Sequence, residues 1–214
     1  MPFSENFSYR PPEEELASME RPDADRAEQV RGIRSHLVDY LELKSPEDAE
    51  RIGFVRAAEL PGEFGEQFRF LDDGRLAETL VAVVPDDLWH KGGQPSESMA
   101  ERGTVLVRGG YFGGEREAEK DPSAWMTHEL AHCQRFADLE DEDEYGRESG
   151  TPAFSGLGPD TYPNNKVEEH AFGRQFAYLK EKGIERDQVA DLLREHYGPE
   201  GFLFLDRILD RVFG

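Results

Sequence analysis

Residues 121–133 constrain the fold and the chemistry of this chain more than any other stretch of its 214 residues. Asp121 is a good N-cap, Pro122 suits the first position of a helix, and apolar residues recur after them at helical spacing. The stretch contains the pattern His-Glu-x-x-His, with His128 and His132 four positions apart. Because a helix turns by about 100° per residue, both imidazoles project from one face, about one turn apart. The sequence therefore predicts a helix that offers two nitrogen ligands to one metal ion.

This pair of histidines suits a zinc ion. Zn²⁺ binds neutral imidazole, and a catalytic zinc site uses three protein ligands and leaves a fourth position to water. Glu129 follows His128 directly, so its carboxylate lies at the flank of the imidazole pair, where it can accept a proton from that water. Glu129 also falls within the apolar arc of the helix, between Trp125 and Cys133, where an unpaired carboxylate is unfavourable to bury. We therefore expect Glu129 to be the general base of a hydrolytic site.

The pattern His-Glu-x-x-His resembles the signature of the zincin metallopeptidases. The resemblance implies that His128 and His132 are zinc ligands and that Glu129 is the general base of amide hydrolysis. In the metzincin branch of this family a glycine turns the chain after the second histidine, whereas Arg135 stands at that position here. The helix is therefore expected to continue, which puts Asp138, the ligand position of that branch, on the wrong face.

In the gluzincin branch the third ligand is a glutamate from a later helix. Residues 165–179 predict such a helix, and Glu168 lies near the middle of its apolar side. A carboxylate centred on an apolar stripe needs a partner, and a metal ion is a sufficient one. The resemblance therefore implies Glu168 as the third zinc ligand. Two alternatives stay open: Glu169 as the ligand, or a capping box in which Asn165 and Glu168 only close the start of the helix.

The later helix departs from one pattern of this branch and agrees with another. In thermolysin-type enzymes an aspartate follows the ligand glutamate by four residues, whereas Phe172 stands there in this chain. The closer similarity is to small bacterial domains with the same signature, in which alanine follows the glutamate by three residues, as Ala171 follows Glu168. The resemblance spans roughly residues 105–179, and its first half is the more specific.

The formal net charge of −21, with a sequence pI near 4.6, limits the partners of the chain. It would repel phosphates, so we expect neither nucleic acid nor an anionic membrane surface as a partner, and basic or neutral polypeptides are favoured. No apolar segment has the length of a membrane span and no secretion signal is recognisable, which favours the cytoplasm. The single cysteine, Cys133, fits a reducing compartment and is expected to be a buried apolar residue.

The remaining patterns predict an α+β fold of zincin-like type. Residues 1–22 contain four prolines and a run of glutamates, which indicates an extended or disordered arm. Residues 23–214 are expected to form a single domain, with a core of about residues 64–183 and C-terminal helices in residues 184–214. We expect a small antiparallel or mixed sheet packed on the motif helix and on the glutamate-bearing helix, with extra helices at both ends.

Shorter patterns predict individual strands and loops. Phe68 and Phe70 alternate with a charged residue, and residues 80–84 are rich in β-formers, which together predict a hairpin. A third strand is expected to begin at residue 104. In zincins the strand before the motif helix commonly forms the edge of the cleft and pairs with the substrate, and the resemblance implies this role for residues 104–108. Residues 139–164 are expected to form a long loop.

Taken together, these patterns predict a zinc-dependent metallopeptidase that acts on a polypeptide substrate. Glu129 would transfer a proton from water to the leaving amine, and Arg135, Tyr145 and Tyr162 are the polar candidates for stabilising the oxyanion. One alternative is a zinc-binding, zincin-like module that recognises a protein partner without cleaving it. A further alternative is a helical interaction protein in which the motif has no chemical role.

Overall fold

The computed structural model describes residues 27–60, 68–71, 74, 76, 79–89, 98–101, 103–110, 122–139, 142–154, 157 and 162–214. Within these residues the chain is an α+β structure, mostly helical, with one four-stranded mixed sheet. The predicted arm at residues 1–22 and the predicted N-cap Asp121 lie outside the described residues. The α+β class and the mixed sheet agree with the prediction from the sequence.

The sheet has the strand order β1-β2-β4-β3. β1 (Gly53–Arg56) pairs antiparallel with β2 (Leu80–Val84), and β2 pairs parallel with β4 (Thr104–Arg108). β3 (Ser98–Glu101) pairs antiparallel with β4 and forms one edge of the described sheet. The two central strands, β2 and β4, are continuous apolar runs that are buried almost throughout, as expected for strands that are covered on both faces.

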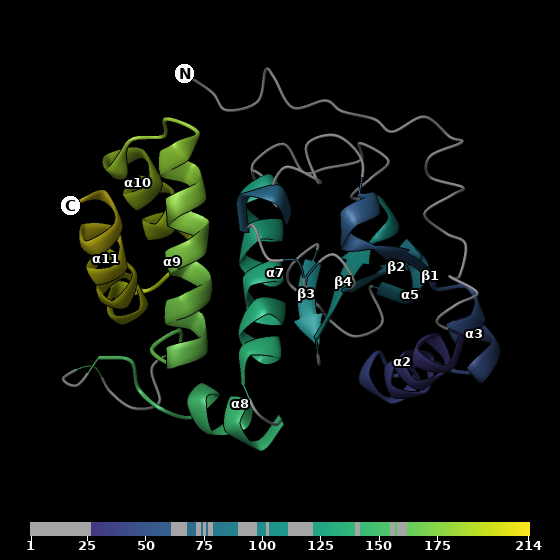
Figure 1. Cartoon of the computed structure of the whole chain (residues 1–214). Helices are drawn as coiled ribbons and strands as arrows, with labels where there is room; N and C mark the ends of the chain where they lie inside the picture. The colour runs from purple at the N-terminus through teal and green to yellow at the C-terminus, as the bar shows by residue number, and fades with distance from the viewer. Residues whose placement is uncertain are drawn as a thin grey trace.

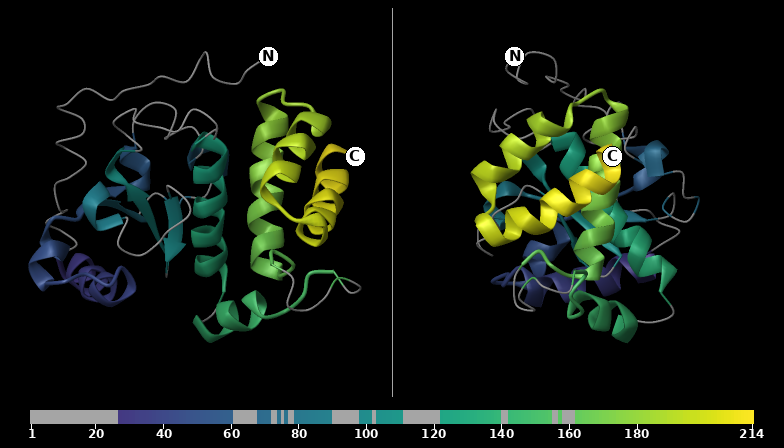
Figure 2. Two further views of the ribbon diagram at one scale, coloured as in Figure 1. Left: turned by 180° about the vertical axis from the view of Figure 1, so that it is seen from behind. Right: turned by 90° about the vertical axis from the view of Figure 1, so that its left-hand side faces the viewer.

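Helices cover both faces of this sheet (Figures 1 and 2). On one face lie α2 (Ala27–Tyr40), α3 (Pro46–Glu50) and α5 (Asp86–Trp89), and on the other lies α7 (Pro122–Asp138). The first face encloses a buried cluster that includes Val30, Leu37, Leu41, Phe54, Leu80, Ala82, Trp89 and Leu106. The second face encloses a cluster that includes Val55, Val81, Val83, Val105, Val107, Met126, Leu130 and Cys133. Successive residues of β2 thus alternate between the two clusters, which fixes the register of the sheet.

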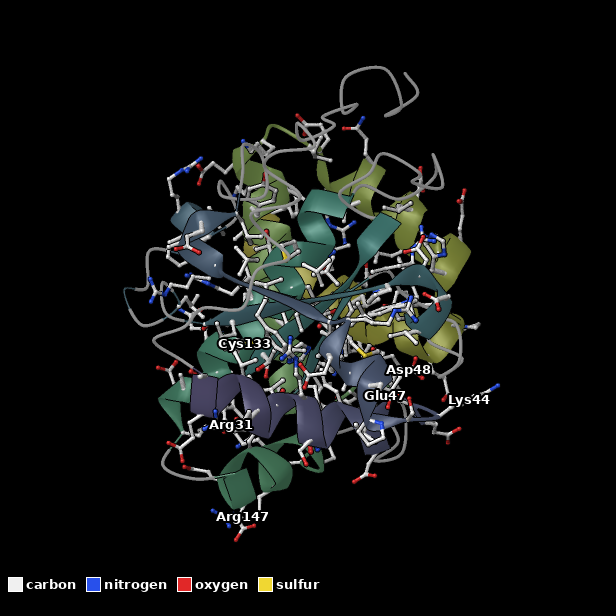
Figure 3. All side chains as sticks on the ribbon, turned by 90° about the vertical axis from the view of Figure 1, so that its right-hand side faces the viewer. Arg31, Lys44, Glu47, Asp48, Cys133 and Arg147 are labelled. Atoms are coloured by element: carbon white, nitrogen blue, oxygen red, sulfur yellow. The ribbon has the colours of Figure 1, made fainter. Side chains whose placement is uncertain are left out.

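Cys133, labelled in Figure 3, is buried in the second cluster, as the sequence predicts. Burial raises the pKa of its thiol above the ordinary value, which keeps the sulfur protonated and unreactive. The cysteine is therefore a packing residue of α7.

Three helices form a further layer on the other side of α7. α9 (Lys166–Glu181) packs against α7 on one side and against α11 (Pro199–Phe213) on the other, and α10 (Arg186–His196) packs against α11. Their buried cluster includes Phe172, Phe176, Val189, Leu193, Phe204, Leu205 and Ile208. These helices agree with the periodicity of the sequence. None of the described helices is both long and apolar enough to cross a membrane.

Two predictions of local structure are wrong. Residues 68–71 form a helical turn instead of the first strand of a hairpin. Phe68 and Leu71 are three positions apart, so the turn puts both on one side, where they pack into the cluster beneath α7. Residues 139–164 are not a continuous loop, because α8 (Glu142–Ser149) forms within them.

The edge role implied for residues 104–108 is also wrong. These residues form β4, which lies between β2 and β3 and is therefore paired on both sides. β3, from Ser98 to Glu101, occupies the edge next to α7 instead. β4, the next strand in sequence, is not at the edge because it pairs antiparallel with β3. The chain turns between the two strands at Gly103.

Replacing Gly103 with alanine is expected to lower the free energy of unfolding by about 2 kcal/mol. Gly103 has a φ of 72°, and a Cβ at this position would lie 3.1 Å from Cδ1 of Phe136. Gly183 is the matched control, since its φ is 78° but no atom lies within 4 Å of its Cβ position. Denaturant unfolding of both variants should show the larger loss for Gly103→Ala. Equal losses would mean that the Phe136 ring moves aside without effect on stability.

Candidate metal centre

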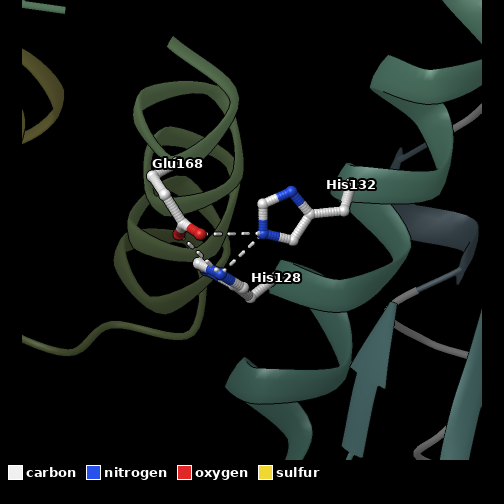
Figure 4. Close-up of side chains that lie close together, drawn as sticks. All are labelled: His128, His132 and Glu168. Atoms are coloured by element: carbon white, nitrogen blue, oxygen red, sulfur yellow. Dashed lines mark hydrogen bonds and ion pairs between the residues drawn. The ribbon is translucent and has the colours of Figure 1, made fainter. Parts of the chain in front are cut away.

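The helix α7 presents different side chains on its two sides. Met126 and Leu130 point into the sheet cluster, whereas His128 and His132 point toward α9 (Figure 4). Both imidazoles are buried, with 3% and 8% of their residue surfaces exposed. Their Nε2 atoms lie 3.1 Å apart. The spacing of four positions therefore brings two potential ligand nitrogens to one point between the helices.

The first turn of α9 supplies the third group of the site. Asn165 is the N-cap, and its Oδ1 accepts a hydrogen bond of 2.9 Å from the backbone N–H of Glu168. The backbone N–H of Asn165 donates to the carbonyl of Pro163 at 2.7 Å. The cap thus uses the backbone of Glu168, and the carboxylate of the same residue is directed at α7.

The side chains of His128, His132 and Glu168 form one cluster (Figure 4). Nε2 of His128 lies 3.3 Å from Oε2 of Glu168, and Nε2 of His132 lies 3.7 Å from Oε1. The possible ligand atoms all lie within 4.8 Å of one another. The structure therefore brings together the three residues that the motif and the resemblance indicate as candidate ligands.

The separations in this cluster fit a tetrahedral metal site. With metal–ligand bonds of about 2.0–2.2 Å, two ligand atoms at the tetrahedral angle lie about 3.3–3.6 Å apart. The observed separations are 3.1, 3.3 and 3.7 Å. Oε2 of Glu168 is buried and accepts no hydrogen bond from the described part of the chain, so a cation would satisfy its remaining charge. The cluster can hold a metal ion.

The three ligand atoms of the cluster indicate what this site can bind. No model of a protein family, no curated protein and no solved structure matches this chain. Function therefore has to be inferred from the chemistry of the site. Two imidazole nitrogens and one carboxylate oxygen suit zinc, and they also suit other divalent transition metals.

The charges of the cluster stabilise one another. Burial alone would raise the pKa of the Glu168 carboxyl and lower that of the His132 imidazole. The two neighbouring imidazoles outweigh burial and lower the pKa of Glu168, while the Glu168 carboxylate raises the pKa of His132. Glu168 is therefore an anion at neutral pH, which is the form that binds a metal ion.

Residues around the cluster fix the two imidazole rings. Tyr145 of α8 places its hydroxyl 3.1 Å from Nδ1 of His132, on the side of the ring away from Glu168. Burial, and then the charge of Glu168, raises the pKa of the Tyr145 phenol, so the hydroxyl stays neutral. The ring of Phe172 packs edge-on against His128, with the centroids 4.4 Å apart. Phe172 thus holds the imidazole of His128 by packing.

Tyr145→Phe is expected to weaken metal binding about tenfold, because His132 would lose the partner that holds Nδ1–H and orients Nε2 toward the cluster. The Phe136 ring, 5.5 Å from that of Tyr145, should keep the phenyl group in place. A competition titration with a chelating dye measures the change in dissociation constant. An unchanged constant would show that the hydroxyl does not orient His132.

Glu129 lies beside the cluster and faces the edge of the sheet. Its Oε2 accepts a hydrogen bond of 2.6 Å from the backbone N–H of Ala100 in β3. Burial raises the pKa of the Glu129 carboxyl, and the charges of His128 and His132 offset part of this rise. A raised pKa makes a carboxylate a better proton acceptor near neutral pH. These are the properties expected of a general base.

The other candidate residues differ in how close they lie to the cluster. Glu169 pairs with Arg211 of α11 at 2.5 Å, so its carboxylate faces the C-terminal layer. Arg135 makes two hydrogen bonds to Glu148, of 2.8 and 2.6 Å, and its charge is thereby matched. Tyr162 is 64% exposed, yet burial of its hydroxyl and then the charge of Glu168 raise the pKa of its phenol, so the hydroxyl lies within electrostatic reach of the cluster. Among the three oxyanion candidates, Tyr145 lies within hydrogen-bonding distance of His132 and Tyr162 lies near Glu168.

Pattern reasoning missed two contributions to the site. The first is the backbone N–H of Ala100, which donates to Glu129. The periodicity of side chains cannot predict a contact made by a backbone group. The second is the contact of Phe172 with His128: the sequence places Phe172 on the apolar side of its helix but does not indicate which residue it contacts. A signal for this contact was present, since Phe172 follows Glu168 by four positions and must share its side of α9.

Proposed function

We propose that this chain is a zinc-dependent metallopeptidase of zincin-like type, with His128, His132 and Glu168 as zinc ligands and Glu129 as general base. The observation that carries the proposal is the convergence of three donor side chains from two helices at separations of 3.1–3.7 Å. A bound zinc ion would supply a Lewis acid that activates water and polarises a carbonyl group.

Glu129 is proposed to move the proton. Its carboxylate would accept a proton from the attacking water and deliver it to the nitrogen of the leaving amine, which is general base and then general acid catalysis by one group. The hydrogen bond from Ala100 holds Oε2, so the carboxylate keeps a fixed orientation beside the imidazoles. This orientation supports the role, because proton transfer requires the base within hydrogen-bonding distance of the reacting atoms.

β3 is an edge strand of the described sheet, which supports a polypeptide as the substrate. Among the described residues β3 pairs with β4 alone, and on its other side the N–H of Ala100 donates to Glu129 of α7. An extended chain can add to such an edge through backbone hydrogen bonds. A substrate bound in this way would pass directly in front of the cluster, so the edge role is proposed for residues 98–101.

Metal analysis combined with an activity assay tests the proposal. The purified chain is expected to hold one zinc ion per molecule after dialysis and to degrade casein, an unstructured protein. Addition of 1,10-phenanthroline should stop degradation, and added zinc should restore it. A folded chain that takes up no metal would overturn the proposal.

The same experiment separates the peptidase from a zinc-binding module that only recognises a partner. Such a module would take up zinc but leave casein and short peptides intact under all metal conditions. Zinc uptake without turnover would therefore reject the peptidase and favour the binding module.

A further inference from the structure

A cleft of about 300 Å³ opens directly beside the candidate metal centre. It lies between the edge strand β3, the C-terminal half of α7 and the helix α8. Among the described residues its lining includes Ala100, Glu101, Gly103, His132, Phe136 and Tyr145. Because His132 is also a candidate ligand, a group in the cleft lies next to the metal position. A volume near the lower end of the range of ligand pockets, about 300–1,000 Å³, suits one side chain of a bound peptide.

Two aromatic rings form one wall of this cleft. Phe136 of α7 and Tyr145 of α8 meet edge-to-face, with ring centroids 5.5 Å apart, and both residues are half-buried. Phe136 is a member of none of the three buried clusters that the described residues form. Its ring therefore leaves apolar surface at the cleft, and covering that surface with another apolar group is favourable.

The polar side chains of the described lining have partners within the protein. Nδ1 of His132 lies 3.1 Å from the hydroxyl of Tyr145, so each group serves the other. Oε1 of Glu101 lies 2.8 Å from Nε2 of His36, on the α2 side of β3. The rings are therefore what the described lining offers to a ligand, and they favour an apolar or aromatic group over a charged one.

Two glycines leave room in front of the rings. Gly103 has a φ of 72° and lies against Phe136, and a Cβ at position 103 would come within 3.1 Å of that ring. Gly146 also lines the cleft, and no described atom outside its own helix lies within 4 Å of its Cβ position. Gly146 lies inside α8, where glycine is less stable than alanine. The missing side chain thus weakens the helix but keeps the border of the cleft open.

The edge strand determines where a bound peptide directs its side chains. Successive side chains of a strand point to opposite faces, and in β3 Met99 packs against the cluster on the α2 face and Ala100 against the cluster on the α7 face. In an added strand, the residue opposite Ala100 points to the same face as Ala100. Its side chain is thereby directed toward α7 and the cleft that Ala100 lines. One extended peptide can therefore pair with β3 and fill the cleft.

We infer that this cleft is a specificity pocket for an aromatic side chain of the substrate, next to the scissile bond. The substrate ring packs against Phe136 and Tyr145 and extends into the space beside Gly146. This inference rests on the proposed peptidase function and adds the substrate class: polypeptides with an aromatic residue at the cleavage site. An aromatic residue fits better than an aliphatic one of similar size, because aromatic rings attract one another beyond the effect of buried area.

Peptides that differ in one side chain test the pocket. Internally quenched peptides carry phenylalanine, cyclohexylalanine or alanine at each position near the scissile bond in turn. At one of these positions kcat/KM is expected to be about tenfold higher for phenylalanine than for alanine, because the pocket buries the larger side chain. It should be about threefold higher than for cyclohexylalanine, whose ring is not aromatic. Equal values for phenylalanine and either of the other two at every position would overturn the inference while the peptidase proposal stands.

Two matched variants then locate the preference. In Gly146→Leu the new side chain begins at the border of the cleft, and the ratio of kcat/KM for phenylalanine over alanine is expected to fall to near one. Gly32→Leu is the control, since Gly32 lies within α2 on the opposite face of the sheet and also has no described atom within 4 Å of its Cβ position. Leucine is a better helix former than glycine, so neither variant should melt below the natural chain. A ratio that falls equally in both variants, or in neither, would overturn the pocket.

A variant of the ring itself gives a second test that does not depend on filling the cleft. In Phe136→Leu the apolar character of the wall is kept but the aromatic partner is lost. The ratio of kcat/KM for phenylalanine over cyclohexylalanine is therefore expected to fall to near one. A ratio equal to that of the natural chain would overturn the pocket, whatever the result for Gly146→Leu.

A binding measurement keeps the inference testable without turnover. N-acetyl-phenylalanine amide is titrated into the zinc-treated chain, and the backbone amide signals of Gly103 and Gly146 are followed by NMR. We expect shifts at these two glycines, with binding about tenfold weaker for N-acetyl-alanine amide. If no peptide is cleaved but these shifts occur, the peptidase proposal fails and the pocket remains. If the shifts are absent, the pocket fails.

Discussion

Glu129→Gln is expected to slow peptide hydrolysis by about 10²–10⁴-fold while the chain still takes up one zinc ion. The carboxylate of Glu129 lies beside the imidazole pair with a raised pKa, and an amide at the same place cannot accept the proton. The amide oxygen of glutamine can still accept the hydrogen bond from Ala100, so the edge strand keeps its position. Initial rates on a quenched peptide measure the loss.

Zinc content and thermal unfolding are the controls for this variant. Both should match those of the natural chain, because the substitution removes a charge without removing a candidate ligand. Full activity in Glu129→Gln would mean that another group accepts the proton. Loss of zinc together with activity would mean that Glu129 supports the metal rather than the proton transfer.

Glu168→Gln is expected to weaken zinc binding by more than a hundredfold, whereas Glu169→Gln leaves it unchanged. Loss of a group that only supports a zinc ligand weakens binding by about 10–100-fold, so loss of a charged ligand should exceed that range. Glu169 is the matched control one position away, and its carboxylate pairs with Arg211, which is 54% exposed. Losing a surface pair of this kind lowers the free energy of unfolding by about 1 kcal/mol or less.

Thermal unfolding with and without zinc gives an independent measure of the same difference. A ligand at about 1,000 times its dissociation constant stabilises the folded state by about 4 kcal/mol. Zinc should raise the melting temperature of the natural chain and of Glu169→Gln. It should leave the melting temperature of Glu168→Gln unchanged. The opposite pattern would make Glu169 the ligand and would contradict the orientation of α9 in which Glu168 faces the imidazoles.

The part of the site that lies on α7 is predictable because it depends on local spacing alone. Positions 128, 129 and 132 take their relative directions from the geometry of one helix. Glu168 could be placed on an apolar helix face from the sequence, but its approach to the imidazoles depends on how α9 packs against α7. Only the resemblance to the zincins indicated that contact, because spacing within one helix says nothing about its neighbour.

The parts contributed by the sheet could not be predicted in the same way. β1 and β3 are each four residues long, which is too short for an alternating pattern to stand out. The position of β3 at the edge is set by its pairing with β4, a contact that hydrophobic periodicity does not encode. Phe68 and Phe70 illustrate the same limit, since two alternating residues fit one helical turn as well as a strand.

The candidate ligands belong to two separate layers, His132 to the helix that covers the sheet and Glu168 to the first turn of α9. An ion held by both would act as a cross-link between the sheet half and the C-terminal helices, in addition to side-chain packing and the hydrogen bond from Arg174 of α9 to the carbonyl of Leu71. Along the chain, α8 and the segment after it separate the two residues, so the link would close a long loop and reduce the freedom of the unfolded chain. The cation would then hold the two halves of the molecule in register, in addition to any chemistry that it performs.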